Sequence, residues 1–270
     1  MRHWFICLVF TLIPLAVSAQ DAVLERLETT DSGREWDAVG RLDINGAGFC
    51  TGALIAPDLV LTAAHCMFDR PTKTRIDPGS FEFLAGWRNG RASAYRQVRR
   101  AVVHPDYVYD QDVTSLRVRN DLALLELQQP IRNTTVVPFD TSERPRRGDE
   151  VGVVSYAKDR ANAPSLQEVC KVMAQQEGML IMSCDVDHGS SGAPIFSFSG
   201  DAPRIVSVVS AKAEVQGRRV ALGTDLTEPL AHLKSQLESG DGFAVPTAPR
   251  SNRITVGGAR RDTGAKFIKP

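Results

Sequence analysis

The sequence reads Leu61-Thr62-Ala63-Ala64-His65-Cys66 where an apolar run rich in β-forming residues ends. This stretch places an imidazole beside a cysteine. Histidine titrates close to neutral pH, so His65 is a candidate general base. A lone histidine is more often a structural residue buried on a short helical turn, and the choice between these interpretations depends on the rest of the chain.

Three other stretches bear on that choice. Upstream, Gly48-Phe49-Cys50-Thr51-Gly52-Ala53-Leu54-Ile55 places a second cysteine in a strand-like pattern. Further along, Asn120-Asp121-Leu122-Ala123-Leu124-Leu125 places a carboxylate at the start of an apolar strand. Far downstream, Gly189-Ser190-Ser191-Gly192-Ala193-Pro194 places a serine between glycines. Together these stretches supply a base, an acid and a hydroxyl nucleophile.

Taken together, these segments resemble the trypsin/chymotrypsin-like serine peptidases, in the branch of short bacterial secreted members. The resemblance extends from about Val39 to about Leu237, and the motifs occur in the family's order. It implies an all-β fold of two six-stranded antiparallel β-barrels with a C-terminal helix. It also implies a secreted serine endopeptidase that needs no metal and no organic cofactor.

The strand pattern agrees with an all-β fold, because short runs of Val, Ile, Leu and Phe alternate with Gly, Pro, Asp and Asn from Val39 onward. Barrel one, about residues 37–128, is expected to contain Val39–Ile44, Gly48–Ile55, Leu59–Thr62, Phe81–Ala85, Tyr95–Val103 and Leu122–Leu127. Barrel two, about residues 149–225, is expected to contain Glu150–Tyr156, Gln167–Ala174, Met179–Ser183, Pro194–Phe198, Arg204–Ala211 and Arg219–Asp225. The proline-containing segment between them is interpreted as a crossing linker.

The C-terminal part changes in kind. Leucines recur at helical spacing from Leu226 to Leu237, which predicts an amphipathic helix over about residues 228–237. We expect the peptidase domain to span residues 20–240 and a basic tail to follow at 241–270. Such a tail either contacts a partner or an anionic surface or, more commonly, stays solvated. Residues 254–258 could add an edge strand.

The first residues predict export. Arg2 and His3 precede an apolar run from Trp4 to Val17, and Ala19 offers a small residue for cleavage. This pattern is typical of a secretory signal peptide over residues 1–19, and a transmembrane anchor would need about 20 apolar residues. We therefore expect a secreted or periplasmic protein. After the signal, a short helix is expected around residues 23–27.

Four cysteines remain after the signal, and an oxidising compartment favours disulfides. Four cysteines allow three pairings. The family resemblance implies a bond between Cys50 and Cys66, which leaves Cys170 to pair with Cys184. The alternative is a zinc site, but the sequence has no Cys-x-x-Cys spacing.

A serine hydroxyl needs a nearby base and a third group that orients the base. His65, Asp121 and Ser191 fit these roles, and the order His, Asp, Ser is that of the trypsin-like enzymes. The resemblance implies that the N–H groups of Gly189 and Ser191 bind the oxyanion. Taken alone, Asp121 is typical of a strand edge or turn cap, and the glycine-serine run of an ordinary surface turn.

The serine motif departs from the family pattern at two positions. Ser190 and Ala193 stand where trypsin carries aspartate and glycine. That aspartate normally pairs with the chain terminus released by zymogen cleavage. Without it, a trypsin-type activation switch is not expected, and removal of the signal peptide should suffice for activity.

Substrate choice is left open by the sequence. Asp185, six residues before Ser191, matches the base of the trypsin specificity pocket and would favour Arg or Lys. Lys212 replaces a small residue of the pocket wall, where it could fold outward, neutralise Asp185 or recruit an acidic side chain. Ser210 is expected to bond Asp121 or a substrate backbone. His188 is expected at the rim and His104 in a structural role.

Composition limits the partners. Lys plus Arg equal Asp plus Glu at 32 each, so no overall field favours nucleic acid or an anionic membrane. We expect a protein or peptide substrate, no stable membrane insertion and a monomer. One alternative is a binding module that keeps the fold without activity. Another alternative is a chaperone-protease with an appended peptide-binding domain. It is less favoured, because little chain follows Leu237.

Overall fold

The computed structural model describes residues 24–109 and 112–244. The expected signal peptide and the edge strand expected at residues 254–258 lie outside this part. Among the described residues, no helix has the length and apolar character to cross a membrane.

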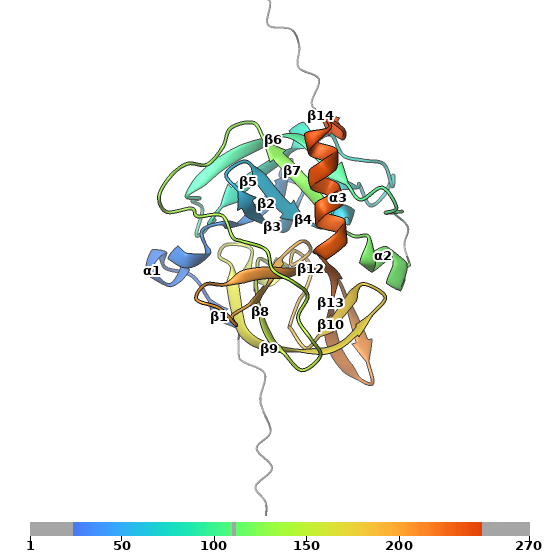
Figure 1. Ribbon diagram of the computed structural model, residues 1–270. Coiled ribbons are helices and arrows are strands. Elements are labelled where there is room, and N and C mark those ends of the chain that lie inside the picture. The colour runs from blue at the N-terminus through green and yellow to red at the C-terminus, as the bar shows by residue number, and fades with distance from the viewer. Residues whose placement is uncertain (1–23, 110–111, 245–270) are drawn as a thin grey trace, which may run out of the picture.

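Two closed, six-stranded antiparallel β-barrels make up the fold, as predicted (Figure 1). Barrel one contains β2 (Val39–Ile44), β3 (Gly48–Ala56), β4 (Leu59–Thr62), β5 (Phe81–Ala85), β6 (Ala94–Val103) and β7 (Ala123–Leu127). Barrel two contains β8 (Glu150–Ser155), β9 (Ser165–Gln176), β10 (Met179–Met182), β11 (Pro194–Ser197), β12 (Arg204–Val215) and β13 (Arg218–Asp225). Pairing of β6 with β7 closes the first barrel, and pairing of β8 with β9 closes the second.

Two short strands extend the barrels. β1 (Glu25–Arg26) pairs with β9, and β14 (Phe243–Ala244) pairs with β6. The helix expected around residues 23–27 was therefore wrong over β1. The first residues of β9 have β8 on one side only, and β1 satisfies backbone groups on the other side.

In the described part of the chain, three α-helices accompany the strands: α1 (Thr30–Gly33), α2 (Ser115–Arg119) and α3 (Thr227–Glu238). α3 confirms the predicted C-terminal helix, and it lies along β6 and β7 of barrel one (Figure 1). Leu230, Leu233 and Leu237 are its buried face. Arg100 of β6 donates to the carbonyl oxygen of Leu237 at 2.9 Å, which satisfies one terminal carbonyl of the helix.

One hydrophobic cluster runs through barrel one and across the seam between the barrels. Phe81 and Phe83 are fully buried in barrel one, and Tyr156 and Phe196 of barrel two belong to the same cluster. The packing is tight at Gly40 in β2, where a Cβ would lie 2.4 Å from the Phe83 ring. The two barrels therefore share a core at their seam, which holds the loops of one against the strands of the other.

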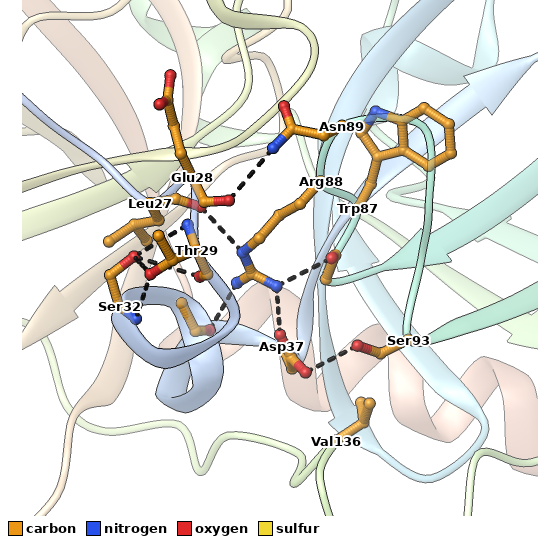
Figure 2. A network of polar contacts seen from close by, with 12 residues as sticks. Leu27, Glu28, Thr29, Ser32, Asp37, Trp87, Arg88, Asn89, Ser93 and Val136 are labelled. Carbon is orange, nitrogen blue, oxygen red and sulfur yellow. Dashed lines mark hydrogen bonds and ion pairs between the residues drawn. The ribbon is translucent and has the colours of Figure 1, made fainter.

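The segment of residues 24–37, called here the N-terminal arm, contacts both barrels. β1 belongs to it and pairs with barrel two. Arg88, in the turn between β5 and β6 of barrel one, donates to the carbonyl oxygens of Leu27 at 2.9 Å and Gly33 at 2.6 Å (Figure 2). The same guanidinium donates to the Asp37 carboxylate at 2.6 Å. The arm thus connects the two barrels on one side.

Two disulfides are present, with the pairing that the family resemblance implied. Cys50 bonds Cys66, and Cys170 bonds Cys184. The first joins β3 to the segment that carries His65, and the second joins β9 to the segment that follows β10.

Candidate active site

His65 lies in η2 (Ala64–Met67), a short 3-10 turn that follows β4 directly. The disulfide between Cys50 and Cys66 ties this turn to β3, with the two Cα atoms 6.4 Å apart. The His65 side chain keeps 13% of its surface exposed. The ring is therefore held by a covalent link yet accessible to a reactant.

Asp121 lies between α2 and β7 and is 1% exposed. Its Oδ1 accepts the backbone N–H of His65 at 2.8 Å, and its Oδ2 lies 2.7 Å from His65 Nδ1. The Ser210 hydroxyl donates to Oδ2 at 2.5 Å, as expected. The carboxylate thus orients the ring and favours the tautomer with its proton on Nδ1, which leaves Nε2 basic.

Ser191 follows β10 in a loop whose glycines are required by close packing. Gly189 has φ +100°, and a Cβ there would lie 2.4 Å from the Phe49 ring. Gly192 has φ +76°, and a Cβ there would lie 2.1 Å from Thr62 Oγ1. The Ser191 carbonyl oxygen accepts a backbone N–H of β3 at 2.8 Å. This loop of barrel two is therefore docked against β3 and β4 of barrel one.

His65 and Ser191 line the same cavity, whose volume is about 430 Å³. A second cavity of about 410 Å³ starts from the same two residues and extends past Phe49 and Phe68. Within the described residues the Ser191 hydroxyl has no hydrogen-bond partner. Catalytic hydrogen bonds in unliganded sites commonly form or tighten when substrate binds. The two groups thus face a common space in which a reactant fits.

The backbone N–H groups around Ser191 differ in whether they have an acceptor among the described residues. The N–H of Ser190 donates to the Asp187 carbonyl oxygen at 2.9 Å, and that of Gly192 to the Val209 carbonyl oxygen at 2.8 Å. By contrast, the N–H groups of Gly189 and Ser191 have no acceptor among the described residues. Such a pair suits an oxygen that becomes negatively charged.

Of the three residues expected to set substrate choice, two line the cavity and one does not. Ser210 and Lys212 line the cavity that holds His65 and Ser191. Asp185 is exposed and lines neither cavity. Its backbone N–H is held by the Gln167 side chain at 2.7 Å. The structure therefore does not bring Asp185 together with the other two.

Asp187, which belongs to none of the motifs quoted above, lines the cavity instead. Lys212 Nζ lies 2.5 Å from Asp187 Oδ1, and each side chain is 49% exposed. The hydrogen bond from Lys212 lowers the pKa of Asp187 to about 2. This ion pair links the two walls of the cavity. The available sequence signal was that Asp187 shares a loop with Asp185, but spacing does not tell which carboxylate points inward.

Other charged side chains line the cavity as well. Arg70 and Arg117 contribute to the lining together with Lys212 and Asp187. His188 is exposed and lines both cavities, as expected for a rim residue. His104 lies elsewhere and lines a separate cavity of about 780 Å³.

A zinc site does not fit the cysteines. In the described part of the chain, Cys50, His65 and Cys66 are the one group of three potential ligands whose donor atoms lie within 4.8 Å of one another. Both sulfur atoms are joined in a disulfide and offer no thiolate. The histidine is left without partners for a metal.

Comparisons with known proteins place this chain among peptidases. The family model described as Trypsin matches residues 28–228. Mannan-binding lectin serine protease 1 of Homo sapiens is 30% identical over 125 residues, which cover 42% of this chain and 17% of that protein. Glutamyl endopeptidase of Bacillus licheniformis is 28% identical over 153 residues, which cover 56% of this chain and 46% of that protein.

Brachyurin of Leptuca pugilator is 29% identical over 102 residues, which cover 38% of this chain and 41% of that protein. The alignments thus span less than half the length of these relatives. Among solved structures, a Glu endopeptidase matches with a TM-score of 0.66 and 17% identity, covering 83% of this chain and 100% of that one. At this identity the structural match supports the fold alone.

Proposed function

The chain belongs to the trypsin family of serine peptidases, and on that basis we propose that it is a secreted endopeptidase with Ser191 as nucleophile and His65 as base. The observation that carries the proposal is the buried Asp121 carboxylate. It binds His65 through the backbone N–H and through Nδ1, at the edge of the cavity that Ser191 also lines.

In the proposed reaction, Ser191 Oγ attacks the carbonyl carbon of the peptide while His65 Nε2 takes the hydroxyl proton. When the C–N bond breaks, His65 returns that proton to the leaving amine and an acyl-enzyme remains. Water then adds in the same way, and Ser191 regains its proton as the acid product leaves. Asp121 stays ionised and stabilises the imidazolium formed in each half-reaction.

The N–H groups of Gly189 and Ser191 are the proposed donors to the tetrahedral oxyanion. Both are free of acceptors among the described residues. Loss of one such donor typically slows a reaction about 10²- to 10³-fold. Export of the protein is part of the proposal, because two disulfides are typical of an oxidising compartment. We assign residues 20–240 to the peptidase domain.

We further propose that the enzyme prefers an acidic residue before the scissile bond. Lys212 and Arg70 line the cavity, and Asp187 is the carboxylate among its described lining residues. An exposed ion pair is worth about 0–1 kcal/mol, so a substrate carboxylate can displace Asp187 from Lys212. The likeness to a glutamyl endopeptidase points the same way.

A fluorophosphonate probe tests the proposed function. Folded wild-type protein should be labelled at Ser191, Ser191→Ala should not be labelled, and His65→Ala should react far more slowly. Ser199→Ala, an exposed serine eight residues on, is the matched control and should react like the wild type. Folded wild-type protein that never reacts would contradict the proposal and favour the binding module.

A further inference from the structure

Arg160 is a buried cation behind the serine loop. It ends η4 (Lys158–Arg160), in the segment between β8 and β9, and is 6% exposed. Its Nη2 lies 3.5 Å from Ser190 Oγ and 3.4 Å from Ser155 Oγ. Ser155 and Ser190 are both fully buried. The guanidinium thus reaches the residue that immediately precedes the nucleophile.

This charge has no buried counter-charge within the described part of the chain. Its ion-pair partner there is Asp159, at 3.2 Å, whose side chain is 72% exposed. Its Nε has no hydrogen-bond partner. Burying a guanidinium with such weak compensation is costly, and the contacts to the two serines are near the outer limit of a hydrogen bond. Stability of the fold therefore does not explain why a cation occupies this position.

The position of Ser190 gives the explanation. Ser190 contributes its carbonyl group to the peptide unit that carries the Ser191 N–H, and it is bonded directly to Gly189, so anchoring Ser190 restricts the backbone that presents both N–H groups. The Ser190 hydroxyl lies 3.1 Å from Ser155 Oγ and 3.2 Å from the Tyr156 carbonyl oxygen. The hydroxyl hydrogen is donated toward these two acceptors. The Ser190 oxygen is therefore left to accept hydrogen bonds from Arg160 and from the backbone N–H of Asp187, the latter at 3.3 Å.

We infer that Arg160 is a positioning residue that binds the Ser190 hydroxyl and thereby holds the N–H groups of Gly189 and Ser191 in place for the oxyanion. In trypsin, the aspartate at the position of Ser190 pairs with the chain terminus released by zymogen cleavage. Here the Arg160 guanidinium, which is part of the folded chain, binds Ser190 in place of that terminus. The inference rests on the proposed peptidase function. The role inferred for Arg160 explains how the oxyanion donors can be held in place with serine at position 190 and without an activating cleavage.

Arg160→Met tests the role, because methionine fills similar space without the charge. We expect kcat to fall by about 10- to 100-fold, somewhat less than the loss of a whole oxyanion donor. KM should stay within about twofold, since substrate binding elsewhere is untouched. The unfolding midpoint should stay equal or rise, because a poorly compensated buried charge has been removed. A merely structural arginine would instead lower the midpoint together with kcat.

Two further variants sharpen the test. Arg160→Lys keeps the charge and should recover part of the lost kcat, whereas Asp159→Asn removes only the exposed partner and should match the wild type. Affinity for a peptide boronic acid, whose adduct carries a tetrahedral anion, should fall in proportion to kcat in Arg160→Met. An active wild type with an equally active Arg160→Met overturns the inference alone. A wild type that reacts with no fluorophosphonate overturns both the inference and the proposed function.

Ser190→Asp gives a readout that does not depend on catalysis. With Arg160 present, the new carboxylate gains an ion-pair partner, so the unfolding midpoint should change little. In the Arg160→Met background the same carboxylate is buried without a partner, and the midpoint should fall by many degrees. Equal shifts in both backgrounds would show that the guanidinium does not act on this position.

Discussion

At the scale of single residues, Asp121 determines the geometry of the site. Three donors converge on its buried carboxylate: the His65 backbone N–H, His65 Nδ1 and the Ser210 hydroxyl. A buried carboxylate is costly unless its lone pairs are satisfied, so each donor is held in place by the others. Ser210 connects this arrangement to β12, the strand that also carries Lys212 at the cavity wall.

Ser210→Ala should lower kcat about tenfold, since a hydrogen bond to a charged group is worth about 1.5–3 kcal/mol. Steady-state kinetics on a peptide substrate would measure this loss. Ser207→Ala is the matched control, because Ser207 lies on the same strand and donates to the Thr224 carbonyl oxygen at 2.8 Å, away from the site. It should lose stability and keep kcat. Equal kcat in the two variants would contradict a role for Ser210 in holding Asp121.

Lys212→Glu should reverse the charge preference at the cut. We expect kcat/KM for peptides with Glu before the scissile bond to fall about 10- to 100-fold, the equivalent of one charge-assisted hydrogen bond. Peptides with Lys there should gain. Profiling against a peptide library measures both changes, with Lys234→Glu on the exposed face of α3 as control. A wild type that cleaves only after Arg or Lys would refute the proposed acidic preference.

At the scale of elements, strand pairing brings distant residues together. β4 and β7 are antiparallel neighbours, with Thr62 opposite Ala123. His65 comes just after the end of β4 and Asp121 just before the start of β7, so the register places both at one edge of barrel one. The disulfide between Cys50 and Cys66 then fixes η2 against β3. The site is therefore built from strand ends, where side chains are free to converge.

Removing this disulfide by changing Cys50 and Cys66 to alanine should lower the free energy of unfolding by about 3 kcal/mol, the chain-entropy value for a loop of this length. Activity should fall as well, because η2 carries His65. Changing Cys170 and Cys184 to alanine opens a loop of similar length, 14 residues against 16, in barrel two. Urea denaturation should show similar stability losses, with kcat reduced mainly in the first variant. Equal kcat losses would contradict a specific role in positioning His65.

At the scale of the whole molecule, both barrels and the C-terminal helix meet around the cavity of about 780 Å³. His104 comes from the end of β6, Glu177 from the turn between β9 and β10, and His232 from α3. The two imidazole rings are 5.9 Å apart. Burial lowers the pKa of His104, with His232 and Arg119 adding to the effect and Asp106 opposing it.

This shift makes a prediction for stability. The folded protein binds a proton on His104 less readily than the unfolded chain, whose histidine has its usual pKa of 6.5. The stabilising contribution is therefore present above that pH and is lost as the pH falls through the lower pKa of the folded state. Urea denaturation across this range should show that the free energy of unfolding falls less with decreasing pH in His104→Gln than in the wild type. The same pH dependence in both proteins would contradict a contribution from His104.

Local sequence pattern was sufficient for the parts of the protein that depend on short-range rules. Alternation of apolar residues with turn residues predicted the strands of both barrels, and leucine spacing predicted α3. The barrel closure and the candidate His65, Asp121 and Ser191 came from the order of the motifs and the family they resemble. Glycine has a physical reason at positions 189 and 192, because φ is positive there and a side chain would collide with barrel one.

The remaining features depend on which surfaces meet in three dimensions. β1 and β14 have two residues each and form only because another strand offers an open edge. Spacing assigned the pocket carboxylate to Asp185, whereas the irregular loop turns Asp187 toward Lys212. Nothing near Arg160 in the sequence indicates a buried cation, because Ser190 lies 30 positions away. Side-chain direction in loops and contacts between distant segments are set by packing across the seam, which a linear pattern does not encode.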